Sequence, residues 1–177
     1  MMTIRLAQKA DLDSILKVVE TAFSDEENKV IKKLVVELSE ETTSPSIKSL
    51  VAELDNQVIG YVSYSPIFLQ FDSSISGYIL APLAVSPEHQ KQGIGSNLVD
   101  TGINMLTKDG VNVLLVYGDP SYYGRFGFKE EIGRSFVPPY PLQYPFGWTG
   151  MMLNETPILN TSIKFECVTA LSKPELW

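Results

Sequence analysis

The protein has 177 residues, of which 44% are hydrophobic and 20% charged, a composition typical of one folded domain with a hydrophobic core. Its formal net charge of −7 argues against a nucleic-acid partner, because phosphate binding needs a basic patch and the Lys and Arg residues are scattered. The single cysteine, Cys167, excludes an internal disulfide, and no stretch reaches the ~20 apolar residues of a membrane span. Residues 1–177 are therefore expected to form a single domain in the cytoplasm, without nucleic acid or membrane as partners.

The first third of the chain predicts a strand, two helices and a hairpin. Residues 3–7 alternate weakly as a strand, and apolar residues at helical spacing predict helices over 12–19 and 30–38. The acidic cluster at residues 25–27 precedes the second helix, where carboxylates suit the positive end of the helix dipole. Residues 49–54 and 57–65 predict two antiparallel strands, because Asp55-Asn56 between them tolerates the positive φ of a tight turn.

The middle of the chain predicts a crossover between two parallel strands. A nearly continuous apolar run at residues 77–85 indicates a strand buried on both faces, in a central position. Pro82 lies inside this run, and a proline is expected in a central strand only where the hydrogen-bonded ladder is interrupted. An amphipathic helix over 94–106 and a buried strand over 111–117 follow. Strand, turn, helix and strand in this order make the two strands parallel.

The last third predicts short elements around a long ordered loop. A short helix is expected over 119–125, and Phe126-Gly127-Phe128 is expected to lead into another strand. Residues 137–148 are dense in proline and aromatic residues, which is typical of an extended ordered loop. Short strands are expected over 149–153 and 162–168. The whole pattern predicts an α/β fold, a mixed sheet with helices on both faces.

Residues 90–96, Gln-Lys-Gln-Gly-Ile-Gly-Ser, connect the central strand to the helix and predict an anion site. Consecutive amides at a helix start, with glycines that permit positive φ and close approach, can bind a pyrophosphate without a cationic side chain. A P-loop is excluded, because Ser96 and Asn97 follow Gly95 where Lys and then Ser or Thr are needed. A dinucleotide-binding oxidoreductase is disfavoured, because Leu98 replaces the third small residue and the strand does not open the fold.

The pattern Q-x-x-G-x-G after Leu-Ala-Val resembles the coenzyme A loop of the GCN5-related N-acetyltransferase (GNAT) superfamily, R/Q-x-x-G-x-G/A. The order of the predicted elements is also similar to that of the family. Downstream, Tyr-Tyr-Gly-Arg-Phe-Gly-Phe at residues 122–128 resembles the bacterial N-acetyltransferases of the YhbS type. The resemblance implies the acyl-CoA N-acyltransferase fold, whose mostly antiparallel sheet has a V-shaped splay between two parallel strands. The interruption at Pro82 gives that splay an independent physical reason.

The resemblance also implies a reaction and a set of site residues. The activity would be transfer of an acetyl group from acetyl-CoA, the co-substrate, to a primary amine by direct attack within a ternary complex. The pantetheine arm would pair with strand backbone, and the N–H of Val85 or its neighbour would polarise the thioester oxygen. Tyr123 aligns with the tyrosine that protonates the leaving thiolate, and the reference pKa of a phenol, about 10, suits this step. A packed aromatic role for Tyr123, with Tyr122 its equivalent neighbour, stays open. The cofactor-binding residues implied are Leu83, Ala84, Val85, Gln90, Lys91, Gln92, Gly93, Ile94, Gly95 and Ser96.

Other features remain open from the sequence. The general base could be Glu26, Glu27, Tyr64 or a water, although a solvated charge at a helix start is the favoured interpretation of each glutamate. Because residues 78–85 lack the strand glutamate that serves as base in some relatives, a catalytically weak CoA-binding or sensing module is the alternative function. No cluster has metal-ligand spacing, so no metal is expected. The sequence does not decide the identity of the acceptor amine, the length of the acyl group, or whether the protein is a monomer or a homodimer. It also does not decide whether residues 136–148 line the acceptor pocket.

Overall fold

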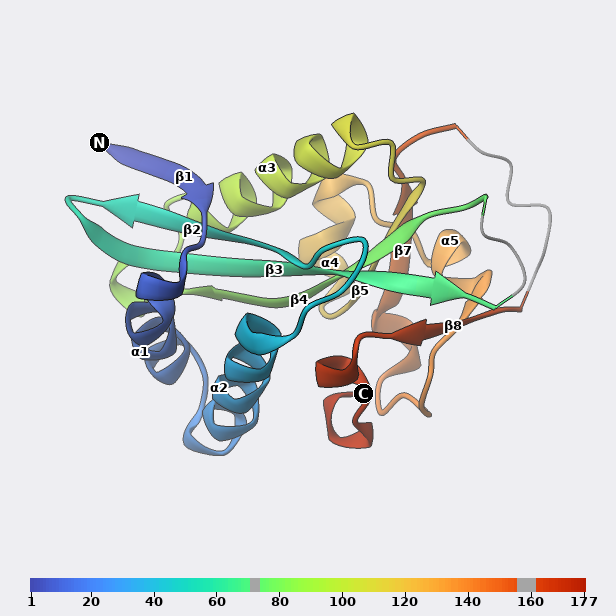
Figure 1. Cartoon of the computed structure of the whole chain (residues 1–177), viewed down its shortest axis with the longest axis horizontal. Helices are drawn as coiled ribbons and strands as arrows, with labels where there is room; N and C mark the ends of the chain where they lie inside the picture. Colours follow the sequence, from blue (N-terminus) through green and yellow to red (C-terminus); the bar gives the residue numbers. More distant parts are fainter. Residues whose placement is uncertain (71–73, 156–161) are drawn as a thin grey trace. The chain divides into compact units, whose positions relative to one another are not determined.

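The computed structural model describes residues 1–70, 74–155 and 162–177 (Figure 1). Residue contacts divide the chain into two compact units, Met1–Tyr64 with Pro82–Gly102, and Ser65–Ala81 with Ile103–Trp177. Within the described residues no helix is long and apolar enough to span a membrane.

The strands follow the order β1-β2-β3-β4-β5-β7, with β8 paired to β3 and β6 paired to β8. Most of these pairs are antiparallel, whereas β4 with β5 and β6 with β8 are parallel. The predicted α/β class and the mostly antiparallel sheet are therefore confirmed. The strand bounds are Met2–Leu6 (β1), Lys48–Leu54 (β2), Gln57–Leu69 (β3), Gly77–Val85 (β4), Val113–Tyr117 (β5), Phe136–Val137 (β6), Trp148–Met152 (β7) and Ile163–Cys167 (β8).

The first unit is built on the predicted hairpin of β2 and β3. Asp55 and Asn56 have φ values of 49° and 62°, the left-handed pair that matches the twist of two antiparallel strands. The hairpin prediction is thus confirmed. β3 continues to Leu69, four residues beyond the predicted end at residue 65.

Helices α1 (Leu12–Ala22) and α2 (Asp25–Glu40) cover one face of this hairpin. Their apolar side chains share a buried cluster with Val51 of β2, Tyr61 of β3 and Ala84 of β4. Ser24 caps α2 by accepting a hydrogen bond from the N–H of Glu27. Three carboxylates lie in the first turn of α2, as the helix dipole favours.

Helix α3 (Ile94–Lys108) packs on the other face of β3, because side chains alternate along a strand. A Cβ added to Gly60 would lie 3.0 Å from Leu98 Cδ1 and 3.1 Å from Ile94 Cγ2, so the helix lies close to the strand. Further along, the buried ring of Tyr64 occupies the space where a side chain of Gly102 would be. The Tyr64 hydroxyl donates to Leu98 O at 3.1 Å.

Gly102→Ala tests this packing. Alanine normally favours a helix interior over glycine by about 1 kcal/mol, but here the added methyl overlaps the Tyr64 ring. We expect the free energy of unfolding in urea to fall by about 1–3 kcal/mol, the usual cost of overpacking. Asn104→Ala, at an exposed position of the same helix, should leave it unchanged or raise it slightly. A rise in the free energy of unfolding of the Gly102→Ala variant would contradict the close packing of Tyr64 against Gly102.

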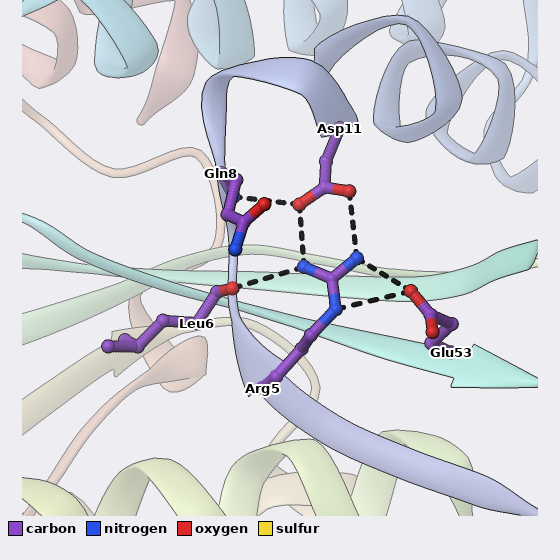
Figure 2. Close-up of polar contacts among 5 residues, drawn as sticks. All are labelled: Arg5, Leu6, Gln8, Asp11 and Glu53. Atoms are coloured by element: carbon purple, nitrogen blue, oxygen red, sulfur yellow. Dashed lines mark hydrogen bonds and ion pairs between the residues drawn. The ribbon is translucent and has the colours of Figure 1, made fainter. Parts of the chain in front are cut away.

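An ion-pair cluster ties β1 and β2 to the start of α1 (Figure 2). The Arg5 guanidinium donates to both carboxylate oxygens of Asp11, at 2.8 and 2.9 Å, and to Glu53 Oε2, at 3.1 and 2.6 Å. The N–H of Gln8 also donates to Asp11, at 2.7 Å. The hydrogen bonds from Arg5 hold the pKa of Asp11 below its usual value, although burial opposes this.

Asp11→Asn should therefore destabilise the protein in a pH-dependent way. A lowered pKa in the folded state means that the stabilisation is complete above the unfolded pKa of 3.8 and is lost as the pH falls below it. At pH 7 we expect a loss of about 1–3 kcal/mol in unfolding free energy, which shrinks below pH ~4. Asp13→Asn removes the same charge from an exposed position, so urea unfolding of both variants at pH 7 and pH 3 separates the ion pair from a general charge effect. A loss at pH 7 that persists in full at pH 3 would contradict this assignment.

In the second unit, β5 pairs in parallel with β4 and antiparallel with β7. The parallel ladder runs from Gly77 opposite Val113 to Leu80 opposite Val116, and so ends two residues before Pro82. The interruption expected around Pro82 is consistent with this register, while the V-shaped splay itself stays a prediction.

The strand expected after Phe126-Gly127-Phe128 is wrong. Gly127 ends a 3₁₀ turn with φ of 102°, and this left-handed residue turns the chain. Only Lys129 then pairs, as an isolated bridge to Gly150. The short helix α5 (Glu130–Arg134) follows at once, and its Gly133 lies against the backbone of Trp148. The local alternation of aromatic residues gave no sign of this docking.

Candidate functional site

The glycine loop is fixed to the end of β4 by side-chain amides. Gln90 Nε2 donates to Val85 O at 3.0 Å. Gln92 Nε2 donates to Glu88 O at 3.2 Å, in the 3₁₀ turn Pro87–His89. Both glutamine side chains therefore hold the loop itself.

Two residues of the loop have left-handed backbone conformations. Lys91 has φ of 62° and Gly93 has φ of 81°. A Cβ added to Gly93 would meet nothing within 4 Å, so glycine is favoured there by its backbone angle and not by lack of space. Left-handed residues next to ordinary ones turn successive N–H groups into a concave site that can bind an anion.

The loop ends where α3 begins, at a buried anchor. Ile94 is buried beside Gly60, as described above, whereas Lys91, Gln92 and Gly93 are exposed. The N–H of Asn97 donates to Gly93 O at 2.9 Å, so the N–H groups before Asn97 have no acceptor one turn back in the helix. These amides lie at the positive end of the α3 dipole, which is a favourable place for a phosphate.

The three predicted strand residues end β4, and the turn Pro87–His89 connects them to this loop. Ala84 is buried in the cluster with α1 and α2, and Leu83 and Val85, which alternate with it, are partly buried. All three lie outside the ladder of β4 with β5, which is confined to Gly77–Leu80. The first unit thus brings together all ten residues predicted to bind the cofactor.

Tyr123 lies in the second unit, at the end of the short helix α4 (Pro120–Tyr123). The side chain of Asp119 caps this helix by accepting from the N–H of Ser121 at 2.9 Å. The Tyr123 ring meets the rings of Tyr122 and Phe128 edge-on, with centroids 5.0 and 5.7 Å away. Burial, with smaller contributions from Tyr122 and Asp119, raises the pKa of Tyr123 above that of an ordinary phenol. The group is therefore protonated at neutral pH, as a proton donor must be.

The candidates for a general base lie in different environments. Glu26 and Glu27 are exposed in the first turn of α2. Tyr64 is fully buried and its hydroxyl already donates to the backbone of α3, so it acts as a packing residue. Among the described residues, no three His, Cys, Asp or Glu side chains are grouped as metal ligands.

A hydroxyl cluster that the sequence analysis did not single out lies on the opposite face of β3 from Tyr64. Ser49 and Ser63 are directly opposite each other on β2 and β3, with their Oγ atoms 3.0 Å apart. Both hydrogen-bond to the phenol of Tyr61, although burial still raises the pKa of that group. The signal available in the sequence was a pair of polar side chains two residues apart, Tyr61 and Ser63, in the otherwise apolar strand β3.

Comparisons with known proteins identify the family of this chain. A family model for the acetyltransferase (GNAT) domain matches residues 3–130. The chain is 30% identical over 164 residues to the uncharacterized N-acetyltransferase YjhQ of Escherichia coli (strain K12), covering 90% of this chain and 88% of that protein. It is 32% identical over 129 residues to YhbS of the same strain, covering 72% and 74%. The chain belongs to the GNAT family of acetyltransferases.

Solved structures extend this likeness to the whole fold. The YhbS N-acetyltransferase of Escherichia coli in complex with CoA superposes with a TM-score of 0.82 at 26% identity, over 97% of this chain and 92% of that one. A GNAT family acetyltransferase from Brucella melitensis in complex with acetyl-CoA gives 0.70 at 26% identity, over 97% and 98%. The predicted family, fold and acyltransferase class are confirmed, and these two ligands bear out acetyl-CoA as the predicted co-substrate.

Proposed function

We propose that this acetyltransferase moves an acetyl group from acetyl-CoA to a primary amine, which attacks the thioester directly within a ternary complex. The observation that carries the proposal is the glycine loop, whose backbone donors converge at the start of α3 without need of a basic cluster. A diphosphate is the part of coenzyme A that such a loop recognises.

Within the loop, we assign the pyrophosphate to the backbone N–H groups of residues 93–96. Gln90 and Gln92 contribute by fixing the loop, because their amides bond to Val85 O and Glu88 O. Lys91 is exposed and its charge can add to the attraction for the phosphates. The predicted binding residues of the loop thus divide into direct donors and residues that hold the donors in place.

The strand residues would position the reacting end of the co-substrate. Leu83, Ala84 and Val85 lie outside the β4–β5 ladder, which leaves this part of β4 suited to pair with the amide-containing pantetheine arm. The N–H of Val85 or its neighbour would polarise the thioester oxygen, since charge develops there as the amine attacks. Acetyl-CoA supplies the activated acyl group, and no covalent enzyme intermediate is needed.

Tyr123 would complete the reaction by giving its phenolic proton to the sulfur as the carbon–sulfur bond breaks. Its raised pKa keeps the phenol protonated at neutral pH, so the proton is present when the sulfur leaves. The proton lost by the amine would pass to water or to one of the exposed glutamates at the start of α2, Glu26 or Glu27.

A CoA-binding or sensing module is the second candidate. It is favoured by the absence of any acidic residue from positions 78–85, where some relatives have a base. The two functions differ in turnover, so a thiol-release assay across polyamines, aminoglycosides, amino acids and peptides separates them. Tight binding of acetyl-CoA with no release from any amine would favour the sensing module.

Gly93→Ala tests the glycine loop by thermal shift with acetyl-CoA, CoA, NAD and ATP. In the unmodified protein only the two CoA forms should raise the melting temperature, by binding the folded state. The variant puts a side chain at φ of 81°, which costs about 1–2 kcal/mol and should weaken CoA binding roughly tenfold by misplacing the amides.

Gly110→Ala is the matched control for this experiment. Gly110 has φ of 79° and equally open surroundings, at the other end of α3. It should lower the melting temperature of the free protein by a similar amount and leave the affinity for CoA intact. An absence of any shift with CoA and acetyl-CoA in the unmodified protein would refute the proposed cofactor.

Tyr123→Phe tests the proton donor. Loss of a general acid should lower kcat by about 100-fold or more, while the CoA thermal shift is retained. Tyr122→Phe removes the neighbouring hydroxyl and should keep most of the rate. Because the pKa of Tyr123 is raised, its phenol should stay protonated between neutral pH and pH ~9. Over this range, kcat of the unmodified enzyme should not fall through ionisation of Tyr123. A Tyr123→Phe variant with full rate would rule out the assigned role.

A further inference from the structure

We propose that Gly118 is a positioning residue for Tyr123, because its missing side chain provides the space in which the phenol ring lies. The proposal rests on the proton-donor role of Tyr123 given above. It assigns an effect on the rate of the chemical step to a residue that directly follows β5 (Val113–Tyr117).

One edge of the Tyr123 ring occupies the space where a side chain of Gly118 would begin. A Cβ added there would be 2.6 Å from Cε2, 3.2 Å from Cδ2 and 3.7 Å from Cζ of the Tyr123 ring. Non-bonded carbons prefer about 3.5–4.0 Å, so any other residue at position 118 must displace the ring. The contact involves the rigid ring itself, close to the carbon that bears the hydroxyl.

Two neighbouring rings contact the Tyr123 ring. Tyr122 meets it at an interplanar angle of 90° and Phe128 at 75°. The backbone of Tyr123 is held as well, since its N–H donates to Asp119 O at 3.0 Å. A push at Cε2 therefore moves the hydroxyl, which is the part of the ring farthest from this fixed backbone.

The backbone of Gly118 cannot retreat from the ring either. Its N–H donates to Gly147 O at 3.0 Å, and a Cβ on Gly147 would lie 2.7 Å from Gly118 O. The turn that contains Gly147 is itself fixed, because the N–H of Tyr144 donates to the hydroxyl of Tyr117 at 2.8 Å. Gly118 is thus enclosed between this turn and the Tyr123 ring.

A conformational reason for glycine does not apply at this position. The described glycines with positive φ are Gly93, Gly110 and Gly127, and Gly118 is not among them. Alanine is compatible with the backbone there, so the requirement for glycine comes from the ring alone. This separates Gly118 from the glycines of the loop before α3.

A stability cycle tests the geometry without reference to activity. When Tyr123 is intact, Gly118→Ala should lower the melting temperature. In a Tyr123→Ala background, where the ring is absent, the same substitution should cause no such loss. Gly124→Ala is the matched control, because a Cβ there meets nothing within 4 Å and its φ is −57°. An equal loss from Gly118→Ala in both backgrounds would overturn the proposal.

A kinetic cycle with acetyl-CoA and an accepted amine tests the consequence. Gly118→Ala should lower kcat roughly 10- to 100-fold, as expected for a reacting group misplaced by about 1 Å. The KM for acetyl-CoA and the activity of Gly124→Ala should change little. In a Tyr123→Phe background, Gly118→Ala should cause no further loss, since the proton donor is already absent.

The two cycles distinguish failure of this proposal from failure of the proposed function. A slow Tyr123→Phe together with a fully active Gly118→Ala would overturn the positioning role alone. Full activity of Tyr123→Phe would overturn the acid role of Tyr123 and the positioning role with it. A multiplicative loss in the double variant would show that Gly118 acts through another part of the protein, which also overturns the proposal.

Discussion

The close packing of α3 on β3 is the constraint on which the candidate site depends. Gly60 lets the first turn of the helix approach the strand, and Tyr64 fills the space left by Gly102 one turn beyond Leu98. These contacts fix the helix along its axis and around it. The loop residues have few buried side chains of their own, so their amides are held in place by the helix that they begin and by the side-chain amides of Gln90 and Gln92.

The electrostatics of the loop explain how an acidic protein can bind a highly anionic ligand. The net charge of −7 gives a long-range repulsion that salt screens within about 10 Å. Backbone N–H groups and the helix dipole act at short range and carry no net charge, so they attract a phosphate at its binding site without changing the charge of the surface. The same surface charge would attract an amine acceptor before it loses its proton.

Much of the fold could be predicted from the sequence because its signals are local. The Asp55-Asn56 turn, the apolar run of β4 and the helical spacing in α1, α2 and α3 each lie within a few residues of the element that they specify. The strand expected after Phe128 failed because Gly127 and the docking of Gly133 on Trp148 decided the path. The spatial roles of Tyr64 and Gly118 could not be predicted, since both depend on side chains brought from other elements.

The facing pair Ser49 and Ser63 has a consequence for how reliably the hairpin forms. A slip of one residue between β2 and β3 would turn every side chain of one strand to the opposite face. The Ser63 hydroxyl, which is fully buried, would then lose its partner inside an apolar layer, a cost of about 1–3 kcal/mol for an unsatisfied group. The slip would also place the Tyr61 ring where Gly60 now admits α3. The hydroxyl pair therefore helps to specify the register of β2 against β3. In that register Gly60 faces α3, the helix that begins at the glycine loop.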